Sequence, residues 1–245
     1  MITVVKNSEN NIDRTIRSII AQKYKNFEHI IVDGKSKDNT IKKILKYKKS
    51  LNILLSEKDD GIYFAMNKGL SLAKGKVIVF VNSGDKITKN ALKIIKKKFD
   101  ENKKIDFVFG TVLRHYTKSK ILKFGFNESR IKYNFDFATS HSTGFFIKRK
   151  AMIKLGKFNT IYKCSADYDL YYKAIIKNKL KGSSTKKNQL IGTVMAGGYS
   201  SKVGFLDHIF EETRIRLNNK QNFIFVILLF SNAIVKGILK KIKFF

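Results

Sequence analysis

The 245-residue sequence has no proline, no tryptophan, a single cysteine and no long hydrophobic run. Because Cys164 has no second cysteine to pair with, a disulfide within the chain is excluded, and a reducing compartment is expected. We expect Cys164 to be a small buried residue rather than a nucleophile. The start of the chain, MITVVKNSEN, lacks a basic region followed by an apolar core, so no secretory signal is expected.

Acidic residues are scarce: 19 stand against 50 lysines and arginines, which gives a formal net charge of +31. Only seven of the basic residues are arginines, whereas proteins that read nucleic acids more often use arginine, which binds bases and phosphates bidentately. A lysine coat favours any anionic partner, such as nucleic acid, an anionic bilayer or a phosphorylated substrate, or it is simply solvated. The hydrophobic content of 43% suits a globular domain with a core.

The first half of the chain alternates between short apolar runs and segments with helical spacing. Such alternation predicts an α/β fold with a mostly parallel central sheet and helices on both faces. The expected strands are residues 2–5, 27–32, 51–55, 77–81 and 105–109, and the expected helices are residues 12–20, 41–45, 61–75 and 88–99.

The second half of the chain is less regular. Residues 114–124 alternate weakly, which predicts a strand of an antiparallel hairpin, and residues 143–148 predict another strand. Residues 167–178 have helical spacing, and residues 181–188 predict a polar loop.

The last stretch, residues 223–245, differs in character from the rest. Residues 223–230 are wholly apolar but too few to span a bilayer, which takes about 20 residues. Four lysines follow among isoleucine, leucine and phenylalanine: Lys236, Lys240, Lys241 and Lys243. The stretch predicts either a basic amphipathic segment at a membrane interface or a C-terminal helix packed on the domain. We therefore divide the chain into a domain of residues 1–215 and a helical extension of residues 216–245.

The segment KVIVFVNSGD, residues 76–85, places a carboxylate just after an apolar strand. In open α/β sheets, ligands bind at the carboxyl ends of the strands. Asp85 alone is a poor cage for a metal, but it can partner a divalent ion whose other ligands are phosphate oxygens and water. The segment indicates a nucleotide-diphosphate site with a metal at Asp85, unless it is a plain turn after a strand.

Five blocks occur in the order ITVVKN, NFEHIIVDGKSKDNT, LLSEKDDGIYFAMNKGLSLAKGKVIVFVNSGD, HSTGFFIKR and SADYDL. With them the sequence resembles the family 2 glycosyltransferases with the GT-A fold, over roughly residues 2–179. The resemblance implies an inverting enzyme that uses a nucleotide-activated sugar. Within this family, the sequence is similar to the bacterial subgroup of enzymes that build capsule, lipopolysaccharide or exopolysaccharide.

The resemblance also implies a role for each matching residue. The residues expected around the nucleotide are Asn7, Glu9, Asp33, Lys58, Asp60, Gly61, Asn67, Lys68 and Asn82. Asn82 and Asp85 match the two ends of the family's DxD-like motif, and Asp85 is expected to bind a divalent metal, Mn²⁺ or Mg²⁺. UDP is the expected nucleotide, ahead of GDP and dTDP.

On the acceptor side, the resemblance implies that His141 and Ser142 line the site and that Asp167 is the catalytic base. The acceptor hydroxyl attacks C1 of the sugar as the nucleotide diphosphate leaves, so a carboxylate close to that hydroxyl can take its proton. Asp169 lies two residues further along, and two such positions on a helix do not share a face. Only one of the two is therefore expected to be the base.

Three positions depart from the family pattern. Lys6 stands where an aromatic residue is usual, Lys35 lies in the VDGKS turn, and Phe64 stands where the family has an acid. The resemblance implies that Phe64 alters sugar or acceptor specificity. None of the departures removes a carboxylate that the resemblance assigns to the site, so an active enzyme is expected.

The leading hypothesis is an inverting glycosyltransferase that acts on a glycan or lipid-linked acceptor in surface polysaccharide biosynthesis. The basic coat and the C-terminal segment favour a cytoplasmic protein, peripheral on the anionic inner face of the membrane. The alternatives are a basic nucleic-acid-binding protein and a catalytically silent family member. No nucleic-acid partner is expected, because acids at the ligand edge of the sheet repel phosphates that carry no metal. The donor sugar, the linkage and the oligomeric state stay open.

Overall fold

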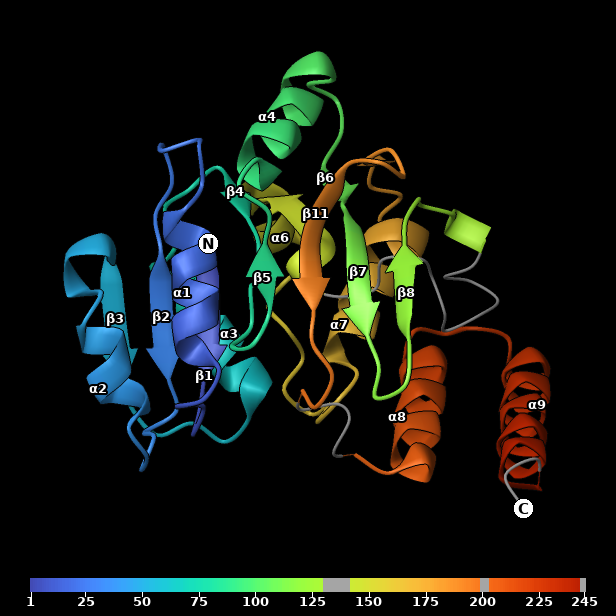
Figure 1. Ribbon diagram of the computed structural model, residues 1–245. Coiled ribbons are helices and arrows are strands. Elements are labelled where there is room, and N and C mark those ends of the chain that lie inside the picture. The colour runs from blue at the N-terminus through green and yellow to red at the C-terminus, as the bar shows by residue number, and fades with distance from the viewer. Residues whose placement is uncertain (130–141, 199–202, 243–245) are drawn as a thin grey trace.

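The computed structural model describes residues 1–129, 142–198 and 203–242 (Figure 1). Strands and helices alternate through the first half, and the chain ends in two helices. The strands are β1 (Ile2–Val5), β2 (Ile30–Asp33), β3 (Ile53–Ser56), β4 (Val77–Ile78), β5 (Lys86–Ile87), β6 (Phe107–Phe109), β7 (Thr111–His115), β8 (Lys120–Lys123), β9 (Phe145–Lys148), β10 (Gly182–Ser184) and β11 (Leu190–Val194). The helices are α1 (Ile12–Ile20), α2 (Thr40–Leu45), α3 (Ile62–Leu72), α4 (Ala91–Glu101), α6 (Arg149–Lys154), α7 (Ala166–Tyr172), α8 (Phe205–Asn218) and α9 (Phe223–Ile242), with short turns η1 (Lys48–Ser50), η2 (Ser142–Gly144) and the π-helical η3 (Lys173–Lys177).

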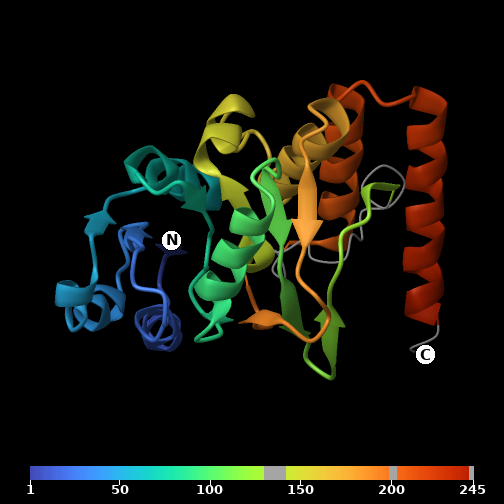
Figure 2. The ribbon, with the colours of Figure 1, turned by 90° about the horizontal axis from the view of Figure 1, so that it is seen from above.

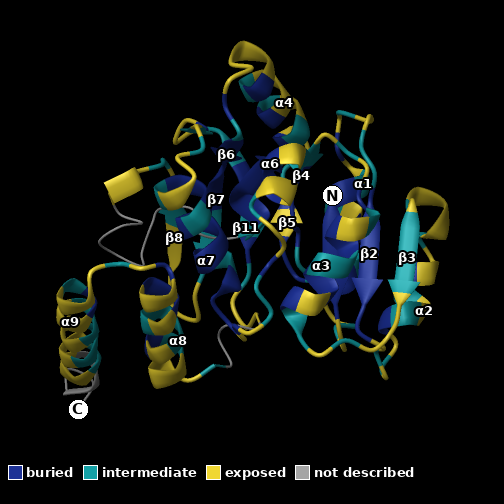
Figure 3. Ribbon diagram, turned by 180° about the vertical axis from the view of Figure 1, so that it is seen from behind, coloured by how far each residue is buried: buried dark blue, intermediate teal, exposed yellow. Residues whose placement is uncertain are grey.

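The N-terminal sheet is parallel throughout, in the order β1-β2-β3. Its side chains alternate between two cores, as the period of two residues in a strand requires. Ile2 and Val4 pack on the side of α3, whereas Val5 and Ile31 pack with α1 and α2. Figures 1 and 3 show α1 on one face and α3 on the other, so the predicted helices on both faces are confirmed for this sheet.

Residues 77–81 join the N-terminal sheet to the rest of the fold. β4 pairs with β9 in antiparallel fashion, and two residues later Phe80 forms a parallel bridge with Ile2. The backbone N–H of Val81 donates to the carbonyl of Ile2 at 2.9 Å. Successive side chains enter two different cores, so the predicted burial of this strand on both faces is confirmed.

The second half of the chain forms two mixed sheets, in the orders β10-β6-β9-β4 and β5-β11-β7-β8. The pairs β10–β6 and β11–β7 are parallel, whereas β9, β5 and β8 run antiparallel to their neighbours. The predicted hairpin is confirmed as the β7–β8 pair. The turned view in Figure 2 shows these strands between the N-terminal sheet and the C-terminal helices.

One element prediction was wrong. Residues 181–188, expected to be a polar loop, contain β10, which pairs in parallel with β6. The strand reads GSS, and no apolar residue reveals it in the sequence. A Cβ on Gly182 would come within 2.2 Å of the Phe107 ring, so this strand is selected by backbone pairing and close packing rather than by its own hydrophobicity.

The helices α8 and α9 lie side by side at the C-terminal edge of the molecule (Figures 1 and 2). Phe210 of α8 and Phe230 of α9 contact each other with ring centroids 5.6 Å apart. Helix α8 runs across the predicted boundary between residues 215 and 216, and the division there stays a prediction. Within the described residues, no helix combines the length and the apolar character needed to cross a membrane.

Candidate active site

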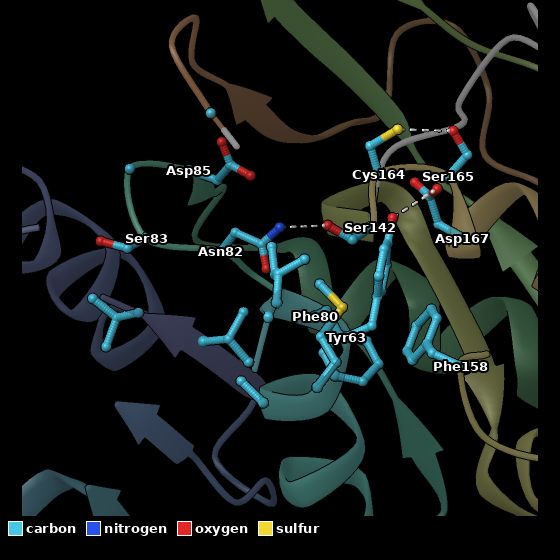
Figure 4. A pocket seen from close by; sticks show the side chains of 18 of the residues that line it. Tyr63, Phe80, Asn82, Ser83, Asp85, Ser142, Phe158, Cys164, Ser165 and Asp167 are labelled. Atoms are coloured by element: carbon cyan, nitrogen blue, oxygen red, sulfur yellow. Dashed lines mark hydrogen bonds between the residues drawn. The ribbon is translucent and has the colours of Figure 1, made fainter. Parts of the chain in front are cut away.

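A pocket of about 900 Å³ lies at the carboxyl ends of β1 and of residues 77–81 (Figure 4). The N-terminal turns of α3 and α7 and one side of α8 complete its wall. The pocket brings together seven of the residues predicted from the sequence: Asn7, Asp60, Gly61, Asn82, Asp85, Ser142 and Asp167.

Asp85 is held in place from two later segments of the chain. Its carboxylate accepts a hydrogen bond from the Thr143 hydroxyl at 2.8 Å and another from the backbone N–H of Met195 at 3.1 Å. The residue is only 5% exposed, although it lines the pocket. The turn after residues 77–81 therefore presents a fixed, nearly buried carboxylate.

Asn82 lies three residues before Asp85 and offers a second oxygen. Its Nδ2 donates to the Ser142 hydroxyl at 3.1 Å. Its Oδ1 is buried, and no residue in the described part of the chain donates a hydrogen bond to it. A buried acceptor left without a partner costs about 1–3 kcal/mol, so this oxygen is suited to a ligand that enters the pocket.

This donor set fits a divalent cation. Mg²⁺ and Mn²⁺ prefer carboxylate and carbonyl oxygens, and Asp85 and Asn82 supply one of each type. Among residues 1–129, 142–198 and 203–242, no group of three His, Cys, Asp or Glu forms a complete cage. The residues thus fit an ion that takes its remaining ligands from phosphate oxygens and water.

Asp167 lies in the first turn of α7 and is half-buried. Its Oδ1 accepts hydrogen bonds from the backbone N–H of Tyr168 at 2.9 Å and from the Tyr63 hydroxyl at 3.3 Å. Burial raises the pKa of Asp167 to about 6, although both hydrogen bonds act to lower it. A carboxylate with such a pKa is ionised at neutral pH and is still basic enough to accept a proton.

Sequence reasoning missed the contribution of α8 to the pocket. His208 and Glu212 lie four residues apart, hence on one face of α8, and both line the pocket. Burial raises the pKa of Glu212 to about 8; Arg216 opposes this shift, and the charge of Asp167 adds to it. The only signal in the sequence was this pair of ionisable residues at helical spacing, because no recognised motif reaches α8.

Five predicted nucleotide-binding residues do not line the pocket, and one acceptor-side residue lies outside the described residues. The five are Glu9, Asp33, Lys58, Asn67 and Lys68, and the one outside is His141. Their predicted roles at the nucleotide or the acceptor stay predictions.

The turns after β1 and β2 are bound to each other. Asp33 accepts hydrogen bonds from the hydroxyl of Ser36 at 2.5 Å and from the hydroxyl of Ser56 at 2.8 Å. Asn7 donates its N–H to the Ser36 hydroxyl at 2.8 Å, and its Oδ1 accepts from the N–H of Lys37 at 2.8 Å. The buried Asp33 thus shapes the turn beside Asn7, which itself lines the pocket.

The other predicted nucleotide residues hold loops in place. Glu9 accepts hydrogen bonds from the backbone and side-chain N–H groups of Asn39, both at 2.9 Å. Lys68 pairs with Glu57 at 2.7 Å and donates to the carbonyl of Lys58 at 2.8 Å. These contacts fix the segments that lead into α2 and α3.

Asn67 of α3 binds the backbone of Phe158 twice, through its Nδ2 and its Oδ1, each at 2.9 Å. This pair of bonds ties α3 to the segment between α6 and α7. Phe158 also stacks on Tyr63 with ring centroids 5.5 Å apart, and both residues line the pocket. Asn67 therefore supports the pocket wall from behind.

Of the two acids in the SADYD block, only Asp167 faces the pocket, as expected. Asp169 is buried and pairs with Lys173 at 2.6 Å and with Asn219 at 2.8 Å. Cys164 is buried, as predicted. Burial, and after it a hydrogen bond to Glu211, raise the pKa of its thiol to about 12, so the thiol is protonated at neutral pH.

The parallel N-terminal sheet, the acidic turn at its ligand edge and the carboxylate of α7 together define the GT-A class of α/β fold. The family model described as "Glycosyl transferase family 2" matches residues 1–162. The match covers more than half of the 245 residues, and the chain belongs to glycosyl transferase family 2.

Solved structures agree on the fold. S. aureus TarS, residues 1–349, superposes with a TM-score of 0.69 at 21% identity, over 88% of this chain and 63% of that one. The mannosyltransferase PcManGT from Pyrobaculum calidifontis, solved with GDP-Man and Mn²⁺, superposes with a TM-score of 0.63 at 16% identity, over 95% of this chain and 68% of that one.

Curated relatives match over shorter stretches. WfgD of Escherichia coli, named UDP-Glc:alpha-D-GlcNAc-diphosphoundecaprenol beta-1,3-glucosyltransferase, is 33% identical over 105 residues. That alignment covers 42% of this chain and 41% of WfgD. Alignments with three further curated relatives cover 34% to 38% of their length, so this chain spans well under half of each of them.

Proposed function

We propose that this protein is an inverting glycosyltransferase, which transfers a sugar from a nucleotide-diphosphate sugar to an acceptor hydroxyl. One observation carries the proposal: a single pocket holds the oxygens of Asp85 and Asn82 together with Asp167, whose pKa of about 6 suits a base. The family supports the reaction class, and the pocket supplies the groups that the reaction needs.

The donor diphosphate belongs at the Asp85 end of the pocket. Asp85 and Asn82 would hold a divalent cation, which when bound neutralises charge on the leaving diphosphate. The TarS complex contains UDP-GlcNAc and the PcManGT complex contains GDP-Man, so the nucleobase is a separate question. We propose UDP, with Asn7 and Asp60 near the nucleotide.

Transfer itself needs one proton acceptor and no enzyme nucleophile. The acceptor oxygen forms a bond to C1 of the sugar while the bond from C1 to the diphosphate oxygen breaks. Asp167 takes the proton of the acceptor hydroxyl. The hydrogen bonds from Tyr63 and from the N–H of Tyr168 hold one carboxylate oxygen and leave the other for the acceptor.

The proposed acceptor is a lipid-linked glycan in surface polysaccharide biosynthesis. The name of WfgD describes a diphosphoundecaprenol-linked acceptor, and TuaG of Bacillus subtilis is named for teichuronic acid biosynthesis. Ser142, which binds Asn82 at the pocket, is placed on the acceptor side of this proposal. Lipid-linked acceptors reside in a membrane, so the protein needs access to its surface.

The α8–α9 hairpin is the proposed contact with the inner, anionic face of the cytoplasmic membrane. Its exposed apolar residues are Phe205, Leu206, Phe210, Leu217, Phe223, Ile224, Ile227, Leu228, Val235, Ile238 and Leu239. Helix α9 contains no acid, whereas Lys220 and Lys236 are exposed on the hairpin, and the whole chain carries a charge of +31. Apolar side chains flanked by lysines fit an anionic bilayer surface.

A thermal-shift titration with UDP, GDP and dTDP, each with and without Mn²⁺, tests the proposal. A ligand that binds only the native state raises the melting temperature, by an amount equivalent to about 2.7 kcal/mol at 100 times its Kd. We expect a rise with one nucleotide that needs Mn²⁺ and is lost in Asp85→Ala, while Asp100→Ala, at an exposed acid of α4, keeps it. No rise with any nucleotide would count against transferase activity and favour a catalytically silent family member.

A further inference from the structure

Glu211 of α8 binds the segment that leads into α7. Its Oε2 accepts hydrogen bonds from the N–H groups of Cys164 and Ser165, both at 2.7 Å, and from the Cys164 thiol at 2.9 Å. Its Oε1 accepts the N–H of Lys163 at 2.5 Å. One carboxylate thus collects three consecutive backbone N–H groups from a part of the chain 46 to 48 residues away.

This contact lies next to the proposed base. Ser165 is the residue before α7, and Asp167 is the second residue of that helix. A run of successive backbone N–H groups that forms a concave surface binds an anion. Glu211 provides that anion and binds the three residues that directly precede α7, the last of which is the N-cap residue Ser165.

Two further contacts fasten α8 to the same region. Asn218, the last residue of α8, donates to the Tyr162 hydroxyl at 2.9 Å, before α7, and Asn219, the residue directly after α8, donates to Asp169 at 2.8 Å, within α7. The segment that carries Asp167 is therefore held by α8 on both sides. Glu211 is the contact that directly precedes Asp167, and it contributes the most hydrogen bonds of the three.

We propose that Glu211 is a positioning residue: its carboxylate sets the direction in which α7 presents Asp167 to the pocket. This role rests on the proposed function, in which Asp167 takes the acceptor proton. Partial burial acts to raise the pKa of Glu211, but the hydrogen bonds from Cys164, Lys163 and Ser165 outweigh it and lower the pKa. Glu211 is therefore ionised at neutral pH, and an ionised carboxylate is a strong hydrogen-bond acceptor for N–H groups.

Glu211→Gln tests the role with a nearly isosteric side chain. The amide has one oxygen to accept hydrogen bonds, and its NH₂ group would face the backbone N–H donors of residues 163–165. The four hydrogen bonds of the Glu211 carboxylate therefore cannot all form. We expect kcat to fall at least about 10-fold while the apparent KM for the nucleotide sugar stays unchanged, because a shift of the base affects the chemical step. With α7 less firmly held, Asp167 becomes more exposed to water, which lowers its pKa. The midpoint of the acid limb of the pH–rate profile therefore moves to lower pH than in the wild type.

Cys164 provides a readout that does not depend on catalysis. It is the only cysteine of the chain, so the pH dependence of its reaction with a disulfide reagent reports this site alone. Burial and Glu211 together raise its pKa to about 12. In Glu211→Gln we expect the thiol to titrate at lower pH and to react faster with a disulfide reagent, whereas Asp207→Asn, the same charge change at an exposed residue of α8, leaves the titration unchanged.

Glu211→Asp and a binding measurement guard against a variant that simply misfolds. Aspartate keeps the charge but is one methylene shorter, and we expect an intermediate loss of kcat with Mn²⁺-dependent UDP binding retained. If Glu211→Gln leaves either the Cys164 titration or kcat unchanged, the positioning role is overturned, but the proposed transferase activity is not. If the wild-type protein transfers no sugar, the proposed function fails instead, and with it the role of Asp167 that this inference assumes.

Discussion

The Tyr63 hydroxyl donates a hydrogen bond to Oδ1 of Asp167 at 3.3 Å, across 104 positions of the sequence. Tyr63 belongs to the first turn of α3, in the GIYFAMNKG block, and Asp167 to the first turn of α7. The bond joins the two helix starts at the pocket (Figure 4). It also engages one oxygen of the proposed base before any acceptor arrives.

Tyr63→Phe removes this donor and leaves the ring in place. The hydrogen bond favours the ionised form of Asp167, so its loss raises the pKa of that carboxyl above its wild-type value of about 6. We expect the acid limb of the rate profile to move to higher pH by up to about one unit, since a hydrogen bond contributes about 1 kcal/mol. Rates measured at several pH values check this; a shift to lower pH would contradict it.

The rate of transfer should depend on the ionisation of Asp167. Because the base acts only when deprotonated, kcat/KM rises as the pH increases through about 6 and levels off above it. Glu212, whose pKa burial raises to about 8, lines the same pocket, so we assign a decline above neutrality to the deprotonation of Glu212.

Asp167→Asn checks the assignment of the base. We expect kcat to fall by about 10²–10⁴-fold and the rise near pH 6 to disappear, because the amide cannot accept the proton. Mn²⁺-dependent nucleotide binding, followed by calorimetry, should survive the substitution. Retained activity with the same pH profile would exclude Asp167 as the base.

The side-chain oxygen of Asn82, to which no described residue donates a hydrogen bond, predicts the effect of adding a charge beside Asp85. Asn82→Asp places a second carboxylate at a position that already offers a buried oxygen. We expect tighter Mn²⁺ binding in the presence of the nucleotide, because carboxylates are preferred ligands of hard divalent ions. Calorimetric titration of Mn²⁺ checks this, with Asn82→Ala as the variant that weakens binding.

Gly69 of α3 is expected to be required for stability. A Cβ at this position would lie 2.5 Å from Cγ2 of Ile2 and 3.4 Å from Cγ2 of Val32. Gly69→Ala should therefore destabilise the fold by about 1–3 kcal/mol in urea unfolding, despite the higher helix propensity of alanine. A Cβ on Gly198 meets nothing within 4 Å, so Gly198→Ala is the matched control.

The α8–α9 hairpin should bind vesicles that contain phosphatidylglycerol and release them as the salt concentration rises. The double variant Ile224→Glu and Leu228→Glu removes two highly exposed apolar side chains of α9 and should abolish sedimentation with such vesicles. Leu45→Glu, an equally apolar but distant site on α2, should bind like the wild type. Equal binding of all variants, or binding to DNA but not to vesicles, would contradict the membrane contact.

The N-terminal fold could be predicted because its signals are local. The apolar run of residues 77–81 and the helical spacing of residues 12–20 both report burial directly, and both elements are confirmed. The strand β10 gave no such signal, since its GSS sequence is held by pairing with β6 and by space that only glycine leaves beside Phe107. No single segment of the sequence contains a signal for long-range packing of this kind.

The candidate site divides in the same way. Asp85 and Asp167 follow from short motifs, and the structure brings both to one pocket. Asn67 and Lys68 belong to an equally clear motif, yet they bind backbone and a glutamate rather than lining the pocket. Glu211 and Glu212 lie in no motif. Their contacts depend on where α8 packs, and no short segment of the sequence reveals that packing.

Helix α8 sets the size of the smallest working unit. A fragment that stopped at residue 162, where the family match ends, would lack Asp167 altogether. A fragment that stopped at residue 204 would retain Asp167 but would lack Glu211 and Asn219, which hydrogen-bond to the segment around it. Trimming this protein for crystals or for engineering therefore has to spare α8, even though the recognisable motifs all precede it.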